Sequence, residues 1–264
     1  KQNISKLIIN GNFIIDAKDG ELASGLVGKG RMEEPEEIVK FIENHLKQGL
    51  PLTGKKVLLT AGPTYEQIDP VRFIGNNSSG KMGYELAEKA FTLGASVTLV
   101  SGPTNLSVTK GIKRVDVRSA SDMLDAVMKE YKDSDVIVMA AAVSDYTPED
   151  TALNKIKKTT DVLQINLKST TDILATISKL KTANQLLVGF ALETANEESN
   201  AKDKLQRKKL DFIVLNSLND KGAGFGHDTN KITIIDNYNN VEKFELKAKS
   251  EVASDIFNKI ISLL

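Results

Sequence analysis

Residues 56–64 read KVLLTAGPT, an apolar run that ends in a turn of small residues. Four more runs have the same form: SVTLV (96–100), DVIVM (135–139), QLLV (185–188) and FIVL (212–215). Continuous apolar runs of this length are typical of strands that are buried on both faces of a parallel sheet. These five segments therefore predict the core of one sheet.

Helical patterns lie between these runs. Residues 82–93, 121–131, 172–180 and 196–210 carry apolar side chains at helical spacing, and Gly94 is placed to end the first of these helices. The alternation predicts an α/β fold, a Rossmann-like doubly wound and mostly parallel sheet with helices on both faces. Residues 231–236 and 241–246 flank Asn-Tyr-Asn-Asn and predict a hairpin, and a final amphipathic helix follows.

A seam between two parts of the chain falls around residues 49–55. We expect residues 1–50 to form an appendage that is loop-like over 1–33 and helical over 34–46, with Pro35 in the first turn. Residues 51–264 are expected to form the main domain. The polar start at Lys1, without an initiator Met, indicates a fragment or a processed chain and no secretory signal.

Composition excludes several classes of protein. Thirty-five Lys and Arg residues balance 35 Asp and Glu residues, so no net field attracts nucleic acid or anionic lipid. No apolar run approaches the roughly 20 residues of a membrane span. The chain has no Cys and two His residues, which excludes disulfides, thiolate zinc sites and cysteine nucleophiles. The remaining chemistry suits phosphate handling, and neither a nucleic acid nor a membrane is an expected partner.

The loop GNNSSGKM (75–82) opens the first predicted helix of the main domain. Backbone N–H groups at a helix start, with glycines that permit close approach, form an anion site. The loop differs from a Walker A phosphate loop because Met82 stands where a hydroxyl is required. The alternative is a turn in which Ser78 or Ser79 caps the helix.

Other candidate residues follow the strand ends. The first strand ends in Ala-Gly-Pro-Thr rather than G-x-G-x-x-G, which disfavours a dinucleotide-binding reductase. Asp145 follows Ala140–Ala142, a run that would let a flat base approach, although a loop Asp also suits an Asx turn. Lys155 lies in NKIKK (154–158), and Lys204 and Lys208 share a helix face. Each lysine could contact phosphate or belong to a solvated edge.

The longest motifs resemble the phosphopantothenoylcysteine synthetase family, the synthetase half of a bifunctional bacterial flavoprotein. The matching strings are TAGPTYEQIDPVRFIGNNSSGKMG (60–83), VTLVSGPT (97–104), AAVSDYTP (141–148), NKIKK (154–158), GFALET (189–194) and GAGFGHDTNKI (222–232). The resemblance implies that 4′-phosphopantothenate attacks the α-phosphorus of CTP, and that L-cysteine then displaces CMP from the acyl cytidylate. It also implies Mg²⁺, a cytoplasmic location and a homodimer. The strand-forming segment around 150–170 and the predicted hairpin resemble the small β dimerisation region of that family.

The resemblance also assigns roles to single residues. Asn76 is expected to hold the reacting carboxylate, Lys155 to neutralise phosphate charge, and Arg72 to bind substrate. The expected nucleotide-binding residues are Gly62, Ser78, Ala141, Ala142, Asp145, Lys155, Phe190, Lys204 and Lys208. The choice of CTP over ATP rests on the resemblance alone. A nicotinamide-dependent reductase and a non-catalytic nucleotide sensor are the competing hypotheses.

Residues 1–48 resemble the tail of the partner decarboxylase, with GELASGLVGKGRMEEP (20–35) matching its substrate clamp. Ser24 stands where that family has a catalytic cysteine, and the flavin-binding body that would precede Lys1 is absent from the sequence. We therefore expect FMN only in the decarboxylase half and no decarboxylase activity from residues 1–264.

Overall fold

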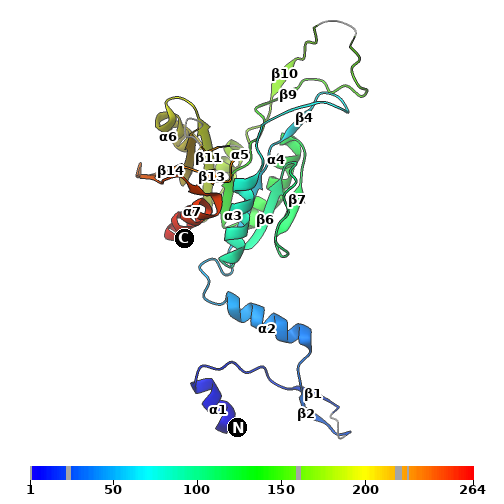
Figure 1. Cartoon of the computed structure of the whole chain (residues 1–264), viewed down its shortest axis with the longest axis vertical. Coiled ribbons are helices and arrows are strands. Elements are labelled where there is room, and N and C mark those ends of the chain that lie inside the picture. Colours follow the sequence, from blue (N-terminus) through cyan, green and yellow to red (C-terminus); the bar gives the residue numbers. More distant parts are fainter. Residues whose placement is uncertain (1, 22–24, 159–161, 218–221, 225) are drawn as a thin grey trace. The chain divides into compact units, whose positions relative to one another are not determined.

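The computed structural model describes residues 2–21, 25–158, 162–217, 222–224 and 226–264. The chain divides into two compact units, Lys1–Thr53 and Gly54–Leu264. Each unit has its own elements (Figure 1), and each is described by itself.

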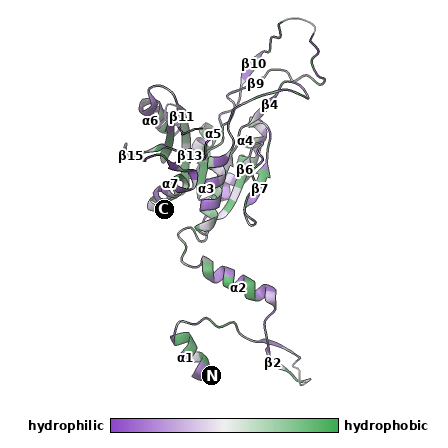
Figure 2. Cartoon of the chain, viewed as in Figure 1, coloured by the Kyte–Doolittle hydropathy of each residue, from purple (hydrophilic) through white to green (hydrophobic). Residues whose placement is uncertain are grey.

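The first unit contains more regular structure than the sequence predicts. It consists of α1 (Gln2–Ile9), a two-stranded antiparallel sheet of β1 (Lys18–Glu21) and β2 (Val27–Arg31), and α2 (Pro35–Lys47). The prediction of loop over 1–33 is wrong for α1, β1 and β2. The two strands were missed because KDGE and VGKGR have only one apolar residue between them, Val27, which is too few to signal a strand. The predicted helix is present with proline in its first turn. Figure 2 shows hydrophobic and hydrophilic residues alternating along α2.

The second unit is built on one eight-stranded sheet in the order β15-β14-β12-β11-β8-β3-β6-β7. Its strands are β3 (Lys56–Ala61), β6 (Ser96–Ser101), β7 (Lys113–Asp116), β8 (Val136–Met139), β11 (Leu186–Glu193), β12 (Phe212–Ser217), β14 (Ile232–Asp236) and β15 (Val241–Lys243). Strands β7, β6, β3, β8, β11 and β12 are parallel, β14 pairs antiparallel to β12, and β15 pairs antiparallel to β14. The parallel strands follow the Rossmann order 3-2-1-4-5-6, which confirms the predicted fold class.

Helices cover both faces of this sheet. On one face, α3 (Lys81–Thr92) packs against α7 (Lys249–Leu263). On the other, α4 (Ala120–Glu130), α5 (Ile173–Leu180) and α6 (Glu197–Arg207) share a core with alternate strand residues, among them Leu58, Ile137 and Leu187. A short 3₁₀ helix, η1 (Tyr131–Asp133), follows α4. The predicted helices are confirmed with small shifts at their ends, and Gly94 follows α3 with a positive φ of 95°.

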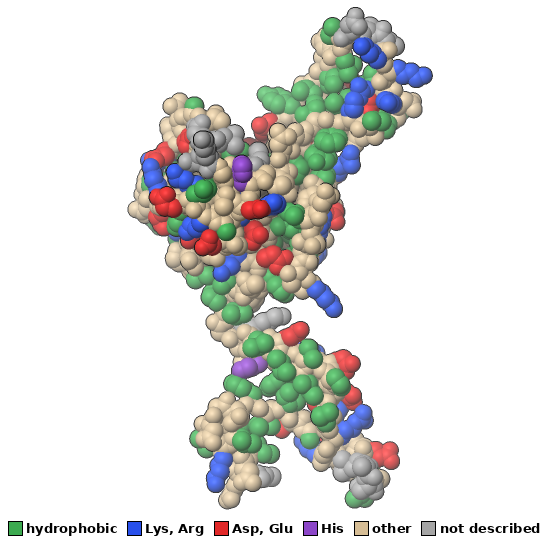
Figure 3. Space-filling view, in the orientation of Figure 1, with side chains coloured by type: hydrophobic (Ala, Val, Ile, Leu, Met, Phe, Trp, Pro, Cys, Tyr) green, Lys and Arg blue, Asp and Glu red, His purple; other side chains and the backbone are tan. Residues whose placement is uncertain are grey.

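Two pairs of strands lie outside the main sheet and form what we call the arm, residues 65–75 and the described part of 146–169. In it β4 (Tyr65–Gln67) pairs with β5 (Phe73–Gly75), and β9 (Tyr146–Pro148) pairs with β10 (Leu167–Ser169). Figure 1 shows the arm extending away from the sheet, and Figure 3 shows hydrophobic side chains along it. The exposed ones include Val71, Phe73, Tyr146, Leu153, Leu163 and Leu167.

The predicted C-terminal hairpin is confirmed as β14–β15, although its second strand ends at residue 243 rather than 246. A further two-stranded pair joins β13 (Thr229–Asn230) to β16 (Lys247–Ala248) at the start of α7. No helix in the described ranges is both long and apolar enough to cross a membrane.

Candidate active site

The site is built where the strand order reverses, between the carboxyl ends of β3 and β8. In open α/β sheets ligands bind in this crevice. The segments that follow the two strands remain paired with each other. Ala142 donates its N–H to the Gly62 carbonyl at 2.9 Å, and Thr64 donates its N–H to the Ala142 carbonyl at 3.3 Å. This pairing places Gly62 beside Ala142, with Ala141 next to them in the chain.

Three glycines, which we call the glycine cluster, bring the start of α3 to the end of β3. Gly62 turns the chain with a φ of +76°. A Cβ added at Gly80 would lie 3.3 Å from the Gly62 Cα, and one at Gly83 would lie 2.5 Å from the Ala61 Cβ. Turn, close backbone approach and tight helix–strand packing are the three roles of the glycines in the dinucleotide-binding motif.

The glycine motif is therefore present in space although it is absent as a continuous string. The residues between Gly62 and Gly80 form the β4–β5 hairpin and the loop after it, so the pattern is split in the sequence. The lack of a continuous glycine string therefore no longer disfavours a dinucleotide-binding reductase. The end of β6 does disfavour it, because Ser101 and the Gly102 that follows it provide no carboxylate that could hold a ribose.

The N-terminus of α3 can accept an anion. Gly80 is the N-cap and provides no side-chain cap, and Tyr84 donates the first intrahelical bond, to the Gly80 carbonyl. The backbone N–H groups of the first turn that precede Tyr84 have no acceptor within the helix. Ser78 accepts a bond from the Gly80 N–H at 3.3 Å, so it shapes the loop and does not cap the helix as the alternative reading required. Lys81 forms an ion pair with Asp228.

Asn76 lies beside the segment that follows β8. Its Nδ2 donates to the Ala142 carbonyl at 2.9 Å and is 3.3 Å from the Val143 carbonyl. Because both partners can only accept, the amide must turn its NH₂ toward them and its Oδ1 away. The side chain is exposed. The structure therefore brings Asn76 to the same alanine that pairs with β3.

Two buried threonines, one in β3 and one in the turn after it, hold this segment, and no sequence motif indicates their role. Thr60 accepts a bond from the Ala141 N–H at 3.2 Å, and Thr64 accepts one from the Ser144 N–H at 2.9 Å. Both threonines are fully buried. A threonine in a β-strand usually signals strand propensity only, so contacts across about 80 positions could not be predicted.

A second group of predicted residues meets at α6. Lys204 donates its Nζ to the Phe190 carbonyl at 2.8 Å, and Lys208 forms an ion pair with Asp172, the N-cap of α5. Burial lowers the pKa of Lys204, which also senses the charges of Asp172 and Asp145. Four residues predicted to bind the nucleotide thus lie near one another: Asp145, Phe190, Lys204 and Lys208. Asp172 joins them, although no sequence motif indicated it.

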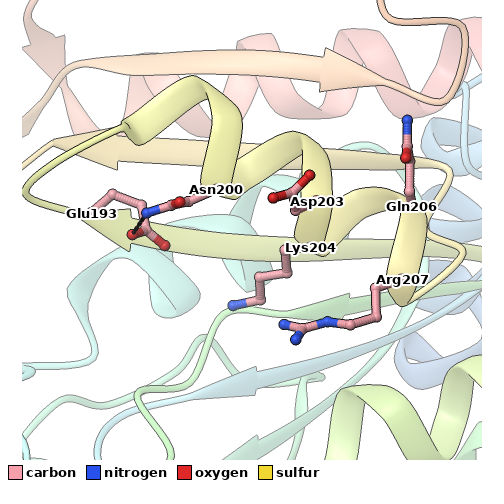
Figure 4. Close-up of a pocket in the computed structure, with 6 residues that line it drawn as sticks. All are labelled: Glu193, Asn200, Asp203, Lys204, Gln206 and Arg207. Carbon is pink, nitrogen blue, oxygen red and sulfur yellow. Dashed lines mark hydrogen bonds between the residues drawn. The ribbon is translucent and has the colours of Figure 1, made fainter.

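Figure 4 shows a depression that contains Lys204 and is lined by side chains of α6 and the end of β11. Lys204 and Arg207 extend from the same side of α6, and Asn200 donates to the Glu193 carboxylate at 3.0 Å. The depression therefore offers both cationic and anionic groups beside Phe190.

Lys155 and Arg72 belong to the arm. Lys155 is exposed, and among the described residues no hydrogen bond or ion pair joins it to Asn76 or Asp145. The Arg72 guanidinium donates to Asp69 through Nε and Nη2, at 3.0 and 2.5 Å, and to the Ile156 carbonyl at 3.1 Å. Most of its hydrogen-bonding groups are therefore engaged within the arm. In the described ranges no group of three His, Cys, Asp or Glu side chains forms a metal cage.

Comparison with known proteins gives three findings. A family model described as the DNA/pantothenate metabolism flavoprotein C-terminal domain matches residues 52–264. The whole chain is 54% identical to 75% of a cysteine/cysteine sulfinic acid decarboxylase of an unknown prokaryotic organism, and 46% identical to 65% of the coenzyme A biosynthesis bifunctional protein CoaBC of Bacillus subtilis (strain 168). A crystal structure of the C-terminal domain of a CoaBC protein superposes with a TM-score of 0.69 at 43% identity, over 81% of this chain and 98% of that one. The chain spans just under two thirds of the Bacillus protein.

Proposed function

The chain belongs to the family of DNA/pantothenate metabolism flavoprotein C-terminal domains, and from this membership we propose that it is a phosphopantothenate–cysteine ligase of coenzyme A biosynthesis. The observation that carries the proposal is the family match over the whole second unit, combined with an anion-binding helix start in the crevice of that unit. The name of the Bacillus subtilis relative, a coenzyme A biosynthesis protein, supports the pathway.

We propose that the reaction has two steps and uses CTP. A carboxylate oxygen of 4′-phosphopantothenate forms a bond to the α-phosphorus of CTP, and the bond to pyrophosphate breaks. The amine nitrogen of L-cysteine then forms a bond to the acyl carbon, CMP leaves with the electron pair of the C–O bond, and the amine loses a proton. No protein nucleophile takes part, which suits a chain without cysteine.

Catalysis then depends on position and charge. We assign Asn76 to the reacting carboxyl group and Lys155 to the phosphates. Arg72 remains a candidate for the substrate. The residues assigned to the nucleotide are Gly62, Ser78, Ala141, Ala142, Asp145, Lys155, Phe190, Lys204 and Lys208, and all except Lys155 have backbone or side-chain neighbours in the crevice or at α6.

Mg²⁺ is the metal ion that we expect with the nucleotide. The donors at the start of α3 are backbone N–H groups, which bind phosphate oxygens rather than a cation. A magnesium ion would therefore be held mainly by the triphosphate, and it would neutralise part of the triphosphate charge.

We propose that the arm joins two copies of the chain. In the described part of the arm seven large apolar side chains are exposed, and Leu153 is 92% exposed. Exposed apolar surface of this kind marks protein interfaces. A homodimer in the cytoplasm, with small-molecule substrates only, is the assembly that we expect, and sedimentation at several protein concentrations tests it.

We propose that residues 1–48 are the tail of a decarboxylase half and that decarboxylation and FMN binding need residues outside this chain. One relative carries the name of a decarboxylase of cysteine and cysteine sulfinic acid, and this chain covers 75% of it. Ser24, which takes the place of the expected cysteine, lies outside the described residues. Release of CO₂ by this chain from cysteine, cysteine sulfinic acid or phosphopantothenoylcysteine would contradict the proposal.

The ligase is tested by incubating the chain with 4′-phosphopantothenate, L-cysteine, Mg²⁺ and either CTP or ATP. With CTP we expect pyrophosphate release, and we expect CMP to form only when cysteine is present. NADPH in place of the nucleoside triphosphate should support no reaction. Lys155→Gln should slow pyrophosphate release by more than about 100-fold and leave a measurable residual rate, and Asn76→Asp should slow the cysteine step more than CTP binding. A folded dimer that releases no pyrophosphate with either nucleotide would refute the ligase.

A further inference from the structure

Asp69 is a buried carboxylate at the turn between β4 and β5. It has no exposed surface. Its Oδ1 accepts the backbone N–H groups of Val71 and Arg72 at 2.8 and 2.9 Å, which closes the turn. Its Oδ2 accepts the Arg72 guanidinium and, at 3.1 Å, the N–H of Ile156. The two oxygens thus have separate tasks, one local and one across 87 positions of the sequence.

Ile156 is held at both of its backbone groups. Its N–H donates to Asp69, and its carbonyl accepts the Arg72 Nη2 at 3.1 Å. A carboxylate and a guanidinium that pair with each other therefore clamp one peptide segment between them. The hydrogen bond to Arg72 holds the pKa of Asp69 well below its usual range, so this carboxylate is charged at neutral pH.

The clamped residue is the next one after Lys155. Upstream, the Ala152 N–H donates to the Ile68 carbonyl at 3.0 Å, so the segment is tied to the β4–β5 hairpin on both sides of Lys155. The side chain of Lys155 stays exposed between the two ties. A lysine ammonium is a point charge on a flexible stem, and its effect on a phosphate depends on where the backbone holds that stem.

We propose that Asp69 is a positioning residue that acts through Lys155, by fixing Ile156 so that the lysine is presented to the phosphates during nucleotidyl transfer. This inference rests on the proposed ligase function and on the assignment of Lys155. Asp69 itself touches no substrate. The two Oδ1 bonds are enough to close the turn of Asp69. The Oδ2 bond to Ile156 is the contact that acts on the lysine segment.

Asp69→Asn separates the two tasks. With its Oδ1 kept on the Val71 and Arg72 N–H groups, the new Nδ2 replaces Oδ2 and faces donors only, so the turn survives and the clamp is lost. Asp236 supplies a matched control at the far end of the sheet. Its Oδ1 accepts two turn N–H groups, its Oδ2 accepts the Lys259 ammonium, and it is 3% exposed.

The experiment measures CTP-dependent pyrophosphate release by the full chain carrying Asp69→Asn, Asp236→Asn, Lys155→Gln or the Asp69→Asn/Lys155→Gln pair. We expect Asp69→Asn to slow release by about 10- to 100-fold and Asp236→Asn to change it by less than about twofold. When Asp69→Asn is added to Lys155→Gln, the rate of pyrophosphate release should fall by a further factor of less than about two, because the two residues act as one unit.

A second readout does not need activity. Trypsin cleaves the Lys155–Ile156 bond, and mass spectrometry should show this cleavage about tenfold faster in Asp69→Asn than in the native chain or in Asp236→Asn. The positioning role is overturned if Asp69→Asn and Asp236→Asn slow release equally, if the cost is the same in both Lys155 backgrounds, or if cleavage is unchanged. A native chain that releases no pyrophosphate would instead overturn the ligase itself.

Discussion

Gly83→Ala tests whether the packing of α3 on β3 sets the site. The added methyl would lie 2.5 Å from the Ala61 Cβ, 3.1 Å from the Ala61 Cα and 3.2 Å from the Thr60 carbonyl oxygen. Non-bonded carbon atoms rest about 3.5–4.0 Å apart. The start of α3 must therefore move away from β3 by about 1 Å, and Gly80 and its neighbouring N–H groups move with it.

Two effects on stability oppose each other in this variant. Overpacking costs about 1–3 kcal/mol, and replacing glycine by alanine in a helix returns about 1 kcal/mol. The free energy of unfolding should fall by about 0–2 kcal/mol, which lowers Tm by up to about 8 °C for a domain of this size. A displacement of about 1 Å at a catalytic site can cost about 100-fold in rate. Activity should therefore fall much further than stability.

The assay compares pyrophosphate release and differential scanning calorimetry for the same preparations. Ala61→Gly removes the atom nearest to the new methyl, so the double variant should recover at least part of the lost rate. Gly28→Ala is the control, because a Cβ there meets no atom within 4 Å. Native activity in Gly83→Ala, or no recovery in the double variant, would refute the argument that this contact positions the helix start.

Three further predictions concern other parts of the second unit. Thr64→Val removes the acceptor of the buried Ser144 N–H and should cost about 1–3 kcal/mol in urea unfolding, whereas Ser144→Ala loses only a 3.4 Å contact and should cost less. Burial would raise the pKa of Asp236, but hydrogen bonds from Asn240 and Lys259 outweigh it and lower that pKa. The stability lost in Asp236→Asn should therefore be full above about pH 4 and disappear as the pH falls through the lowered pKa; an unchanged difference at pH 2 would contradict this. Chelation by EDTA should stop pyrophosphate release and added Mg²⁺ should restore it, while activity that persists in EDTA would exclude the ion.

The sequence predicted those parts of the fold whose signal is local. Runs such as VLL at 57–59 are apolar enough to identify buried strands, and the helices between them have clear periodicity. The edge strand β7 was missed because KRVD has one apolar residue and one neighbour in the sheet. The arm was foreseen only as strand-forming sequence near 150–170, and its described strands are three residues long.

For the site, the sequence identified residues by motif but not the residues that hold them. Gly62 and Ala142 were assigned to the nucleotide and Asn76 to the substrate, and in the structure Gly62 and Asn76 both form hydrogen bonds with Ala142. Thr60, Thr64 and Asp69 were not foreseen, because each acts through a partner that is 80 or more positions away. A turn aspartate reads as an Asx residue in any sequence. The bond from Asp69 to Ile156 can be recognised only in the folded structure.

The split of the glycine cluster has a consequence for how the second unit folds. In a continuous motif the strand and its helix are neighbours along the chain and can associate early. Here residues 63–79 separate Gly62 from Gly80, and closing a loop of this length rather than one of about three residues costs about 1.5 kcal/mol more in chain entropy. The anion-binding helix start should therefore form after the sheet. During refolding, the ability to bind a phosphate compound should return later than the signal of the sheet.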